Sequence, residues 1–363
     1  MSSSGSSFRK RVGTRVPFIL GTKPSIQNAQ LLTSTGVPSL DTFIGGGIPI
    51  GTLFLIEEDV YGNFAKLLFK YYLAEGVISQ HDLHVVSQDV DPVQMIEDLP
   101  KPIEKANLKE GSHFGPKDQM NIAWRYQNLP SVQTEPDTDF GHHYDITQKM
   151  DPAQMQKVNI TYWNADEIDG THLNGNNAYY EELLESIKQR IKNGQFYSED
   201  SPKKRNVLRI GVQSLGSLLW GRDSTNLILF LYKLRSLLQS SYCICLLTIP
   251  THLIKKISDV HRCQHLCDTA VKLESFAGSD RETNPIFKDY HGLFYINKLP
   301  AINSLCSHVP GSFDLAFKLR RKRFSIEMLH LPPELQETTQ REQDDFGSVM
   351  LGCSNPRSKT LDF

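Results

Sequence analysis

Apolar residues occur along this chain in short continuous runs that alternate with stretches of helical period. Short apolar runs bounded by polar residues are typical of strands buried on both faces of a sheet. The predicted strands are residues 52–57, 83–88, 207–213, 242–249 and 269–275. Apolar residues three and four positions apart predict helices between them, at residues 63–75, 180–191 and 227–238. This alternation predicts an α/β fold with a mostly parallel sheet and helices on both of its faces.

The ends of these elements carry signals of their own. Gly76 follows the first predicted helix and Gly194 follows the second, so we expect each glycine to act as a helix stop. Residues 291–297 and 323–329 also read as strands, and no helical pattern separates them. Strands joined without a crossover helix pair antiparallel, which predicts an antiparallel edge near the C-terminus.

Three parts of the chain lack a regular period. Residues 1–16 are rich in Ser and Gly and then basic, and residues 334–363 are polar, so a disordered arm and a disordered tail are expected. Residues 101–178 are rich in Pro, His, Asn and Asp, which predicts an irregular insertion, ordered around Trp124 and Tyr126. We therefore expect a single domain from residue 17 to residue 333.

Composition narrows the class of protein. The formal net charge is −2, so global charge gives no sign of nucleic-acid binding, and any such role must come from local patches or partner chains. No apolar stretch is long enough to predict a membrane span, and the first residues lack the apolar core of a secretory signal. The six cysteines show no disulfide framework, which favours reduced thiols in a cytosolic or nuclear protein. With the family resemblance described below, the expected location is the cytoplasm and also the nucleus.

A phosphate-binding loop is the chemistry that the N-terminal pattern suggests. Residues 34–51 read STGVPSLDTFIGGGIPIG, and a predicted strand, a loop and a helix follow directly. In such a loop, backbone N–H groups cradle phosphate, a lysine reaches the terminal phosphates and a hydroxyl binds Mg²⁺. The order of glycine-rich turn, strand, loop and helix is the setting that this chemistry requires.

The residues for that chemistry are missing. Only Gly62 can serve the tight turn, while Phe64 stands near the lysine position and Ala65 near the hydroxyl position. The carboxylates of residues 57–59, Glu58 among them, would repel a phosphate. Lys66 lies two residues too far along, and a rotation of about 200° on a helix predicts that its side chain points away. These residues indicate a degenerate nucleotide loop.

The second half of a nucleotide site is also altered. An acid that positions Mg²⁺ should end the strand at residues 208–212, and Gln213 stands there instead. An amide can order a water molecule but does not supply a carboxylate's charge. No cofactor is therefore expected to bind through a standard motif, although an atypical nucleotide site stays open.

Two further patterns suggest metal sites weakly. His261, Cys263, His265 and Cys267 alternate, but structural zinc usually takes two separated pairs of ligands, so we expect an ordinary polar segment. Residues 140–145 (FGHHYD) place two histidines side by side, which point apart on an extended chain and favour a packed loop. No metal site is predicted, and the common hydrolase motifs are missing from the sequence.

Long strings of this sequence resemble known families. Residues 34–51 resemble the entry motif of RecA/KaiC-type domains. Further strings resemble the Elongator complex protein 4 family, from about Pro17 to Leu335 and at the C-terminal residues 361–363. The strings are residues 122–130 (IAWRYQNLP), 140–145 (FGHHYD), 208–221 (LRIGVQSLGSLLWG), 274–296 and 315–335.

The resemblance implies a role without catalysis by this chain. Proteins of that family have a RecA-like fold without standard Walker motifs. They join Elongator subunits 5 and 6 in a hetero-hexameric ring that binds the catalytic Elongator lobe and tRNA. The resemblance further implies that ATP modulates tRNA release, and it leaves ATP sites at the ring interfaces open. The complex begins carboxymethyl-type modification of wobble uridines, and the third subunit carries the radical and acetyl-transfer chemistry.

Basic residues supply candidate contacts. Residues 203–205 and 318–323 form basic runs, which are either solvated surface or contacts to tRNA phosphates. Residues 278–292 form a loop that either faces the ring pore, by analogy with RecA-like rings, or lies at a subunit interface. The candidate tRNA contacts are Arg281, Lys288, Arg320, Arg321, Lys322 and Arg323.

Two alternatives to a tRNA-binding ring subunit remain open. One is a divergent NTPase whose site is completed by a neighbouring subunit, with ATP hydrolysis at ring interfaces driving tRNA release. Lys298 is the candidate donor across such an interface. The other alternative is a scaffold without RNA contact.

Overall fold

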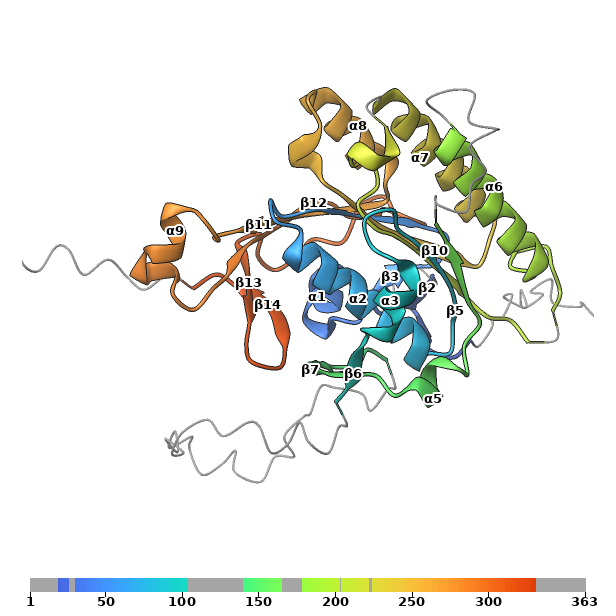
Figure 1. The fold of residues 1–363 in the computed structure, drawn as a ribbon, viewed down its shortest axis with the longest axis horizontal. Helices are drawn as coiled ribbons and strands as arrows, with labels where there is room; N and C mark the ends of the chain where they lie inside the picture. Colours follow the sequence, from blue (N-terminus) through green and yellow to red (C-terminus); the bar gives the residue numbers. More distant parts are fainter. Residues whose placement is uncertain are drawn as a thin grey trace, which may run out of the picture. The chain divides into compact units, whose positions relative to one another are not determined.

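A mixed sheet forms the centre of the molecule, with the strand order β14-β13-β12-β11-β4-β10-β9-β5-β8 (Figure 1). The computed structural model describes residues 19–25, 30–103, 140–164, 178–202, 204–221 and 224–330. Neighbouring strands are parallel from β11 to β8, where the members are β4 (Leu53–Glu57), β5 (Asp82–Val86), β8 (Ile160–Trp163), β9 (Leu208–Val212), β10 (Cys243–Ile249) and β11 (Thr269–Ser275). The antiparallel edge consists of β12 (Gly292–Lys298), β13 (Leu315–Leu319) and β14 (Phe324–Met328).

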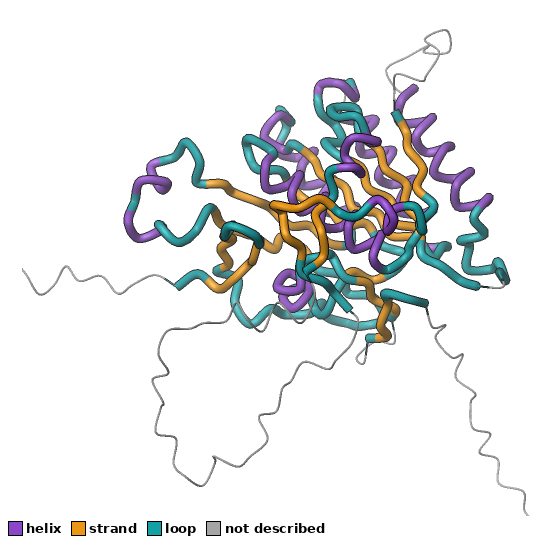
Figure 2. Tube along the Cα trace, turned by 60° about the horizontal axis from the view of Figure 1, so that its bottom comes forward, coloured by secondary structure: helices purple, strands orange, loops and turns teal. Residues whose placement is uncertain are grey.

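Helices cover both faces of this sheet (Figures 1 and 2). One face carries α1 (Pro38–Phe43), α2 (Asn63–Ile78) and α3 (Pro92–Glu97). The other face carries α6 (Ala178–Asn193), α7 (Ser224–Gln239) and α8 (Ile257–Leu266). The predicted α/β architecture with an antiparallel C-terminal edge is confirmed.

Smaller elements connect these layers. The short helical turns are α5 (Pro152–Met155), α9 (Asp280–Thr283), η4 (Leu218–Trp220), η5 (Thr251–Leu253) and η6 (Pro285–Phe287). A small sheet joins β1 (Thr22–Pro24), β2 (Leu31–Thr33) and β3 (Ile48–Pro49), and another joins β6 (Pro100–Pro102) and β7 (Tyr144–Lys149). Among the helices of the described chain, we find none with both the length and the apolar character needed to span a bilayer.

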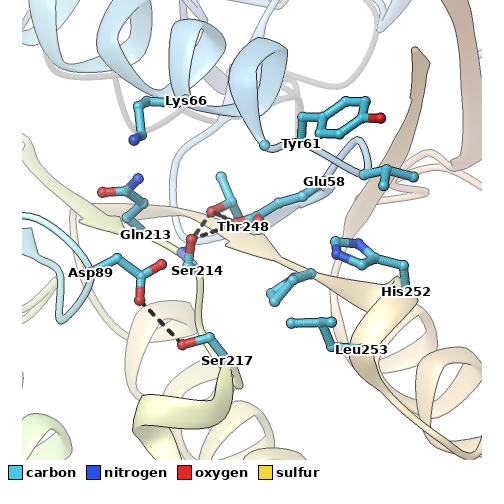
Figure 3. A pocket seen from close by; sticks show the side chains of 13 residues that line it. Glu58, Tyr61, Lys66, Asp89, Gln213, Ser214, Ser217, Thr248, His252 and Leu253 are labelled. Atoms are coloured by element: carbon cyan, nitrogen blue, oxygen red, sulfur yellow. Dashed lines mark hydrogen bonds between the residues drawn. The ribbon is translucent and has the colours of Figure 1, made fainter. Parts of the chain in front are cut away.

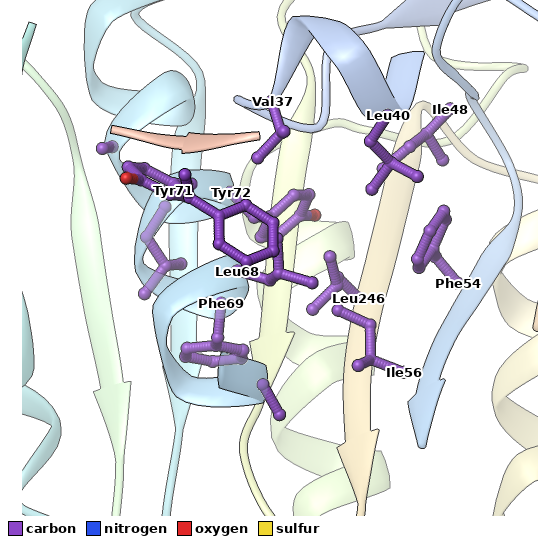
Figure 4. Packing of buried hydrophobic residues seen from close by; sticks show 14 of the residues in the cluster. Val37, Leu40, Ile48, Phe54, Ile56, Leu68, Phe69, Tyr71, Tyr72 and Leu246 are labelled. Atoms are coloured by element: carbon purple, nitrogen blue, oxygen red, sulfur yellow. The ribbon is translucent and has the colours of Figure 1, made fainter. Parts of the chain in front are cut away.

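The sheet separates two apolar cores because successive side chains of a strand point to opposite faces. On β4, Phe54 and Ile56 pack under α1 and α2, as Figure 4 shows, whereas Leu53 and Leu55 pack under α7. Both faces of the central strands are buried, which explains why their sequences are continuously apolar.

Several boundaries differ from those predicted. The prediction that Gly76 stops a helix is wrong, because α2 continues to Ile78. Gly76 instead lets the helix approach the sheet: a Cβ atom there would lie 2.6 Å from Leu83 Cδ2 and 2.9 Å from Arg209 Cδ. The second expected stop is confirmed, because α6 ends at Asn193, directly before Gly194.

The range 101–178 is more regular in its described part than the sequence predicts. It contains β7 and α5, and β8 pairs parallel with β5 as a strand of the main sheet. β8 escapes prediction because it is short and half-buried, so its sequence is not a continuous apolar run. The expected arm at residues 1–16, the tail at 334–363 and the anchors Trp124 and Tyr126 lie outside the described residues.

Candidate functional site

A pocket of about 200 Å³ opens at the carboxyl ends of β4, β5, β9 and β10 (Figure 3). Open α/β sheets bind their ligands at this edge, between strands whose connections run in opposite directions. The lining residues come from the end of β10, from the loops that follow these strands and from the start of α2: Glu58, Val60, Tyr61, Gly62, Lys66, Asp89, Gln213, Ser214, Ser217, Thr248, Pro250, His252 and Leu253.

The start of α2 already holds an anion, supplied by the chain itself. Gly62 stands just before the helix with a φ of 66°, as a tight turn requires. The buried carboxylate of Asp59 accepts hydrogen bonds from the backbone N–H groups of Asn63 (3.1 Å), Phe64 (3.1 Å) and Ala65 (3.0 Å). These are the free donors of a helix N-terminus, which in a phosphate-binding loop would face the nucleotide. Asp59 therefore occupies the phosphate position instead of only repelling an anion there.

The two glutamates beside Asp59 play different roles. Glu58 lines the pocket, and its Oε1 accepts hydrogen bonds from Ser214 Oγ (3.0 Å) and Thr248 Oγ1 (2.6 Å). Burial raises the pKa of Glu58, although both hydrogen bonds oppose the shift. The carboxylate of Glu57 is held by the side-chain amides of Gln264 (2.6 Å) and Asn297 (2.7 Å), so it is part of the packed interior.

The substituted positions of the loop face away from the pocket. Phe64 packs on the antiparallel edge, with its ring centroid 4.6 Å from that of Phe317, and Ala65 is buried. Neither side chain can contact a nucleotide phosphate from there.

Lys66 differs from the prediction, because it lines the pocket. In Figure 3 its amino group extends toward Gln213. Side chains on a helix lean toward its N-terminus, and the long lysine stem uses this lean to reach back over the first turn. The prediction that Lys66 points away was therefore wrong.

Polar residues on the other side of the pocket come from the loops that follow β5 and β9. The side chain of Gln213 is buried and accepts a hydrogen bond from Ser87 Oγ at 3.1 Å. Asp89 is exposed and accepts a hydrogen bond from Ser217 Oγ at 3.3 Å. Within the described residues, no group of three or more His, Cys, Asp or Glu side chains can hold a metal ion.

Half of the pocket was missed by reasoning from the sequence. Asp89, Ser214, Ser217, Thr248 and His252 belong to no local motif, because they lie at or after the ends of three strands, β5, β9 and β10. The available signal was their position after predicted strands, since the carboxyl ends of parallel strands share one edge of a sheet.

A buried polar network lies behind the pocket and centres on Arg209 of β9. Its guanidinium donates to His81 Nδ1 (3.0 Å) and to the backbone oxygens of Ser34 (3.0 Å) and Tyr72 (3.1 Å). Burial and the charge of Arg209 lower the pKa of His81 to about 3, so this ring is neutral. The network therefore joins Ser34 of the glycine-rich motif to α2 and β9.

Glu75 of α2 extends this network to residues 140–145. It accepts hydrogen bonds from His142 Nδ1 (3.1 Å) and from the hydroxyl of Tyr144 (2.7 Å). Burial raises the pKa of Glu75, but the bonds from His142 and Tyr144 and the charge of Arg209 outweigh it and lower this pKa to about 2. The histidine pair of FGHHYD is thus part of a packed structural segment.

The alternating His and Cys residues also have a structural role. Residues 257–266 form α8, so the two residue types separate: Cys263 and Cys267 are buried, whereas His261 and His265 are exposed. Helical geometry sorts positions that a strand would have brought to one face.

The candidate tRNA contacts lie on the antiparallel part of the sheet and its loops. Arg281 pairs with Glu274 at 2.8 Å, and Lys288 is exposed after η6. The remaining four form the exposed turn of the β13–β14 hairpin: Arg320, Arg321, Lys322 and Arg323. Lys322 lies 3.5 Å from a carboxylate oxygen of Asp145.

Lys298, the candidate interface donor, is engaged within its own chain. Its Nζ donates to the backbone oxygens of His265 (2.7 Å) and Cys267 (2.6 Å) at the C-terminal end of α8. A cation there satisfies free carbonyl groups and the negative end of the helix dipole. Any contact with a neighbour's nucleotide would require these bonds to break.

Comparison with known proteins relates this arrangement to one family. The profile of the PAXNEB protein family matches residues 15–363. The chain is 44% identical to Elongator complex protein 4 of Xenopus laevis over 99% of its own length and 96% of the relative. It is 46% identical to Elongator complex protein 4 of Danio rerio, over 96% of this chain and 93% of that protein. It is 43% identical to Elongator complex protein 4 of Homo sapiens, over 91% of this chain and 83% of that protein.

Proposed function

Because this chain belongs to the PAXNEB family, and within it to the Elongator complex protein 4 proteins, we propose that it is a noncatalytic subunit of the Elongator complex. It joins Elongator subunits 5 and 6 in a hetero-hexameric ring, and the ring binds the catalytic Elongator lobe and tRNA. Its contribution to wobble-uridine modification is to hold tRNA, in the cytoplasm and also in the nucleus.

The Asp59 carboxylate on the first N–H groups of α2 is the observation that carries this proposal. A nucleotide would have to displace a tethered carboxylate, whose local concentration is high because it lies only a few residues from its donors. The chain has the architecture of a nucleotide-binding fold, but the Asp59 carboxylate occupies the place where a phosphate would bind. A fold with an occupied phosphate site is better suited to assembly with other subunits than to catalysis.

Assembly of the ring tests the proposal directly. Co-expression of this chain with Elongator subunits 5 and 6 of the same organism is expected to give one hetero-hexameric species in size-exclusion chromatography with light scattering. Omission of either partner is the control and should abolish that species. A well-folded monomer that has no affinity for either partner would contradict the proposal.

A divergent NTPase is the second candidate, and the orientation of Lys66 toward the pocket is the observation that favours it. In that case, Lys66→Ala in the assembled ring would lower the rate of ATP hydrolysis, whereas Lys298→Ala would do so only if its bonds to α8 open. Unchanged turnover in both variants would remove these lysines from the mechanism and leave the noncatalytic role.

A further inference from the structure

Exposed apolar side chains surround the mouth of the pocket. Val60 and Tyr61 line it from the loop before α2, and Leu253 lines it from η5; they are 67%, 60% and 49% exposed. Large apolar side chains that gather at one exposed place, around a polar hollow, are typical of a surface that another protein covers.

Two carboxylates that line the pocket, Glu58 and Asp89, each have an oxygen atom without a hydrogen-bond donor among the described residues. Oε1 of Glu58 is bonded to Ser214 and Thr248, and Oδ1 of Asp89 is bonded to Ser217. Within the described part of the chain, no hydrogen bond reaches Glu58 Oε2 or Asp89 Oδ2. Two carboxylates with one free oxygen each are complementary to a cationic group that carries several N–H donors.

We propose that this pocket receives an arginine or lysine side chain of a neighbouring protein subunit, which docks on the apolar side chains of Val60, Tyr61 and Leu253 and pairs with Glu58 and Asp89. The inference rests on the proposed function, because the neighbour is a subunit of the assembled complex. It adds to the proposed function that the neighbour contributes a cationic side chain, and that this side chain binds at the pocket beside α2.

The size of the pocket favours a single side chain over a small-molecule ligand. Its volume is about 200 Å³, below the roughly 300–1,000 Å³ that is usual for ligand and cofactor pockets. A nucleotide would also bring phosphates toward Glu58 and Asp89, with Asp59 already on the N–H groups of α2. One cationic side chain, together with Lys66, instead balances the charges of the two carboxylates and fits the hollow.

Lys66 and Gln213 line the pocket as well, and their N–H groups can donate hydrogen bonds to the main chain of such a neighbour. Lys66 is exposed at the pocket, and the buried Gln213 uses its Oε1 on Ser87, which leaves its amide NH₂ without an acceptor among the described residues. A backbone carbonyl that enters together with the cationic side chain would satisfy these donors. The pocket thus offers partners for both parts of one docked residue.

Neutralisation of the two carboxylates tests the inference in the complex of this chain with Elongator subunits 5 and 6. Glu58→Gln combined with Asp89→Asn preserves the acceptors that Ser214, Thr248 and Ser217 use. The double variant is expected to raise the dissociation constant about tenfold or more, because a buried cation then loses its counter-charges. Its association should also depend less on salt concentration than that of the unmodified chain.

The matched control is Glu182→Gln, which removes an exposed carboxylate on α6, outside the pocket. It should leave the dissociation constant unchanged, and thermal unfolding of both variants should match that of the unmodified chain.

If the unmodified chain assembles and the double variant binds equally well, the inference is overturned while the proposed function stands. If the unmodified chain does not assemble at all, both are overturned. A third outcome is that Mg-ATP binds the purified chain and that the partner subunits displace it. This would assign the pocket to a nucleotide and would also overturn the inference.

Discussion

Asp59 determines what the first turn of α2 can bind. Three backbone N–H groups converge on its carboxylate, and Gly62 provides the left-handed turn that brings the loop back over the helix. A phosphate-binding loop uses the same donors for an external anion, which must give up translational freedom to bind. The internal carboxylate does not bear that cost, so the helix terminus is satisfied without a ligand.

Removal of this carboxylate should destabilise the fold. Asp59→Ala leaves three N–H groups without their acceptor, and we expect the free energy of unfolding to fall by about 2 kcal/mol. Urea unfolding followed by circular dichroism measures the change. Asp289→Ala, at an exposed position, is the control and should stay within roughly 0.5 kcal/mol of the unmodified chain. Equal stability of the two variants would show that Asp59 does not cap α2.

α2 packs closely on the sheet because glycines occur on both sides of the contact. Gly76 of α2 lies against Leu83 and Arg209, and a Cβ atom on Gly211 of β9 would lie 2.9 Å from Cζ of Phe69. Arg209 cannot shift to make room, because its guanidinium is tied to the buried network. The glycines that look like flexible positions in the sequence therefore fix the distance between helix and sheet.

Gly76→Ala separates two opposing effects. Helix propensity alone would stabilise α2 by about 1 kcal/mol, whereas overpacking against Leu83 and Arg209 costs about 1–3 kcal/mol. We expect overpacking to dominate because the contacts are shorter than any real Cβ contact, and the melting temperature should fall. Differential scanning calorimetry checks this, with Glu182→Ala on the exposed face of α6 as the control. A rise in melting temperature would mean that the core relaxes around the new methyl group.

Positive charge on the molecule is concentrated locally although the net charge is only −2. The exposed turn of the β13–β14 hairpin carries Arg320, Arg321 and Arg323, and Lys322 beside them contacts Asp145. Arg281 has a carboxylate partner in Glu274. The hairpin turn is therefore the stronger candidate for contact with tRNA phosphates, because its charge is less compensated.

Neutralisation of the hairpin turn should weaken tRNA binding by the assembled ring. In the triple variant Arg320→Ala, Arg321→Ala and Arg323→Ala, each lost phosphate contact is expected to reduce the slope of log K against log salt by about one unit or less. Fluorescence anisotropy of labelled tRNA at several salt concentrations measures that slope. Arg281→Ala is the matched comparison and should change it less. An unchanged slope in the triple variant would support a scaffold without RNA contact at this hairpin.

Local sequence was sufficient for much of the fold. Continuous apolar runs predicted β4, β5, β9 and β10, because strands covered by helices bury both faces. β11 was also predicted, although the exposed Lys272 interrupts its apolar run. The sequence also predicts a degenerate nucleotide loop, because the expected positions for lysine and hydroxyl are consecutive and hold Phe64 and Ala65. β13 was not predicted as a strand. Its last residues belong to the basic run 318–323, which also forms the hairpin turn to β14, so the sequence reads as a surface run and not as a strand.

The tertiary structure alone decided what fills the loop and what forms the pocket. Whether Asp59 repels an anion or replaces it depends on the loop's path, and the direction of Lys66 depends on how side chains lean along α2. Asp89, Gln213 and Thr248 are far apart in the sequence and meet because parallel strands end at one edge of the sheet. Spacing along the chain determines periodicity and short motifs, whereas strand order and packing determine which distant side chains share a site.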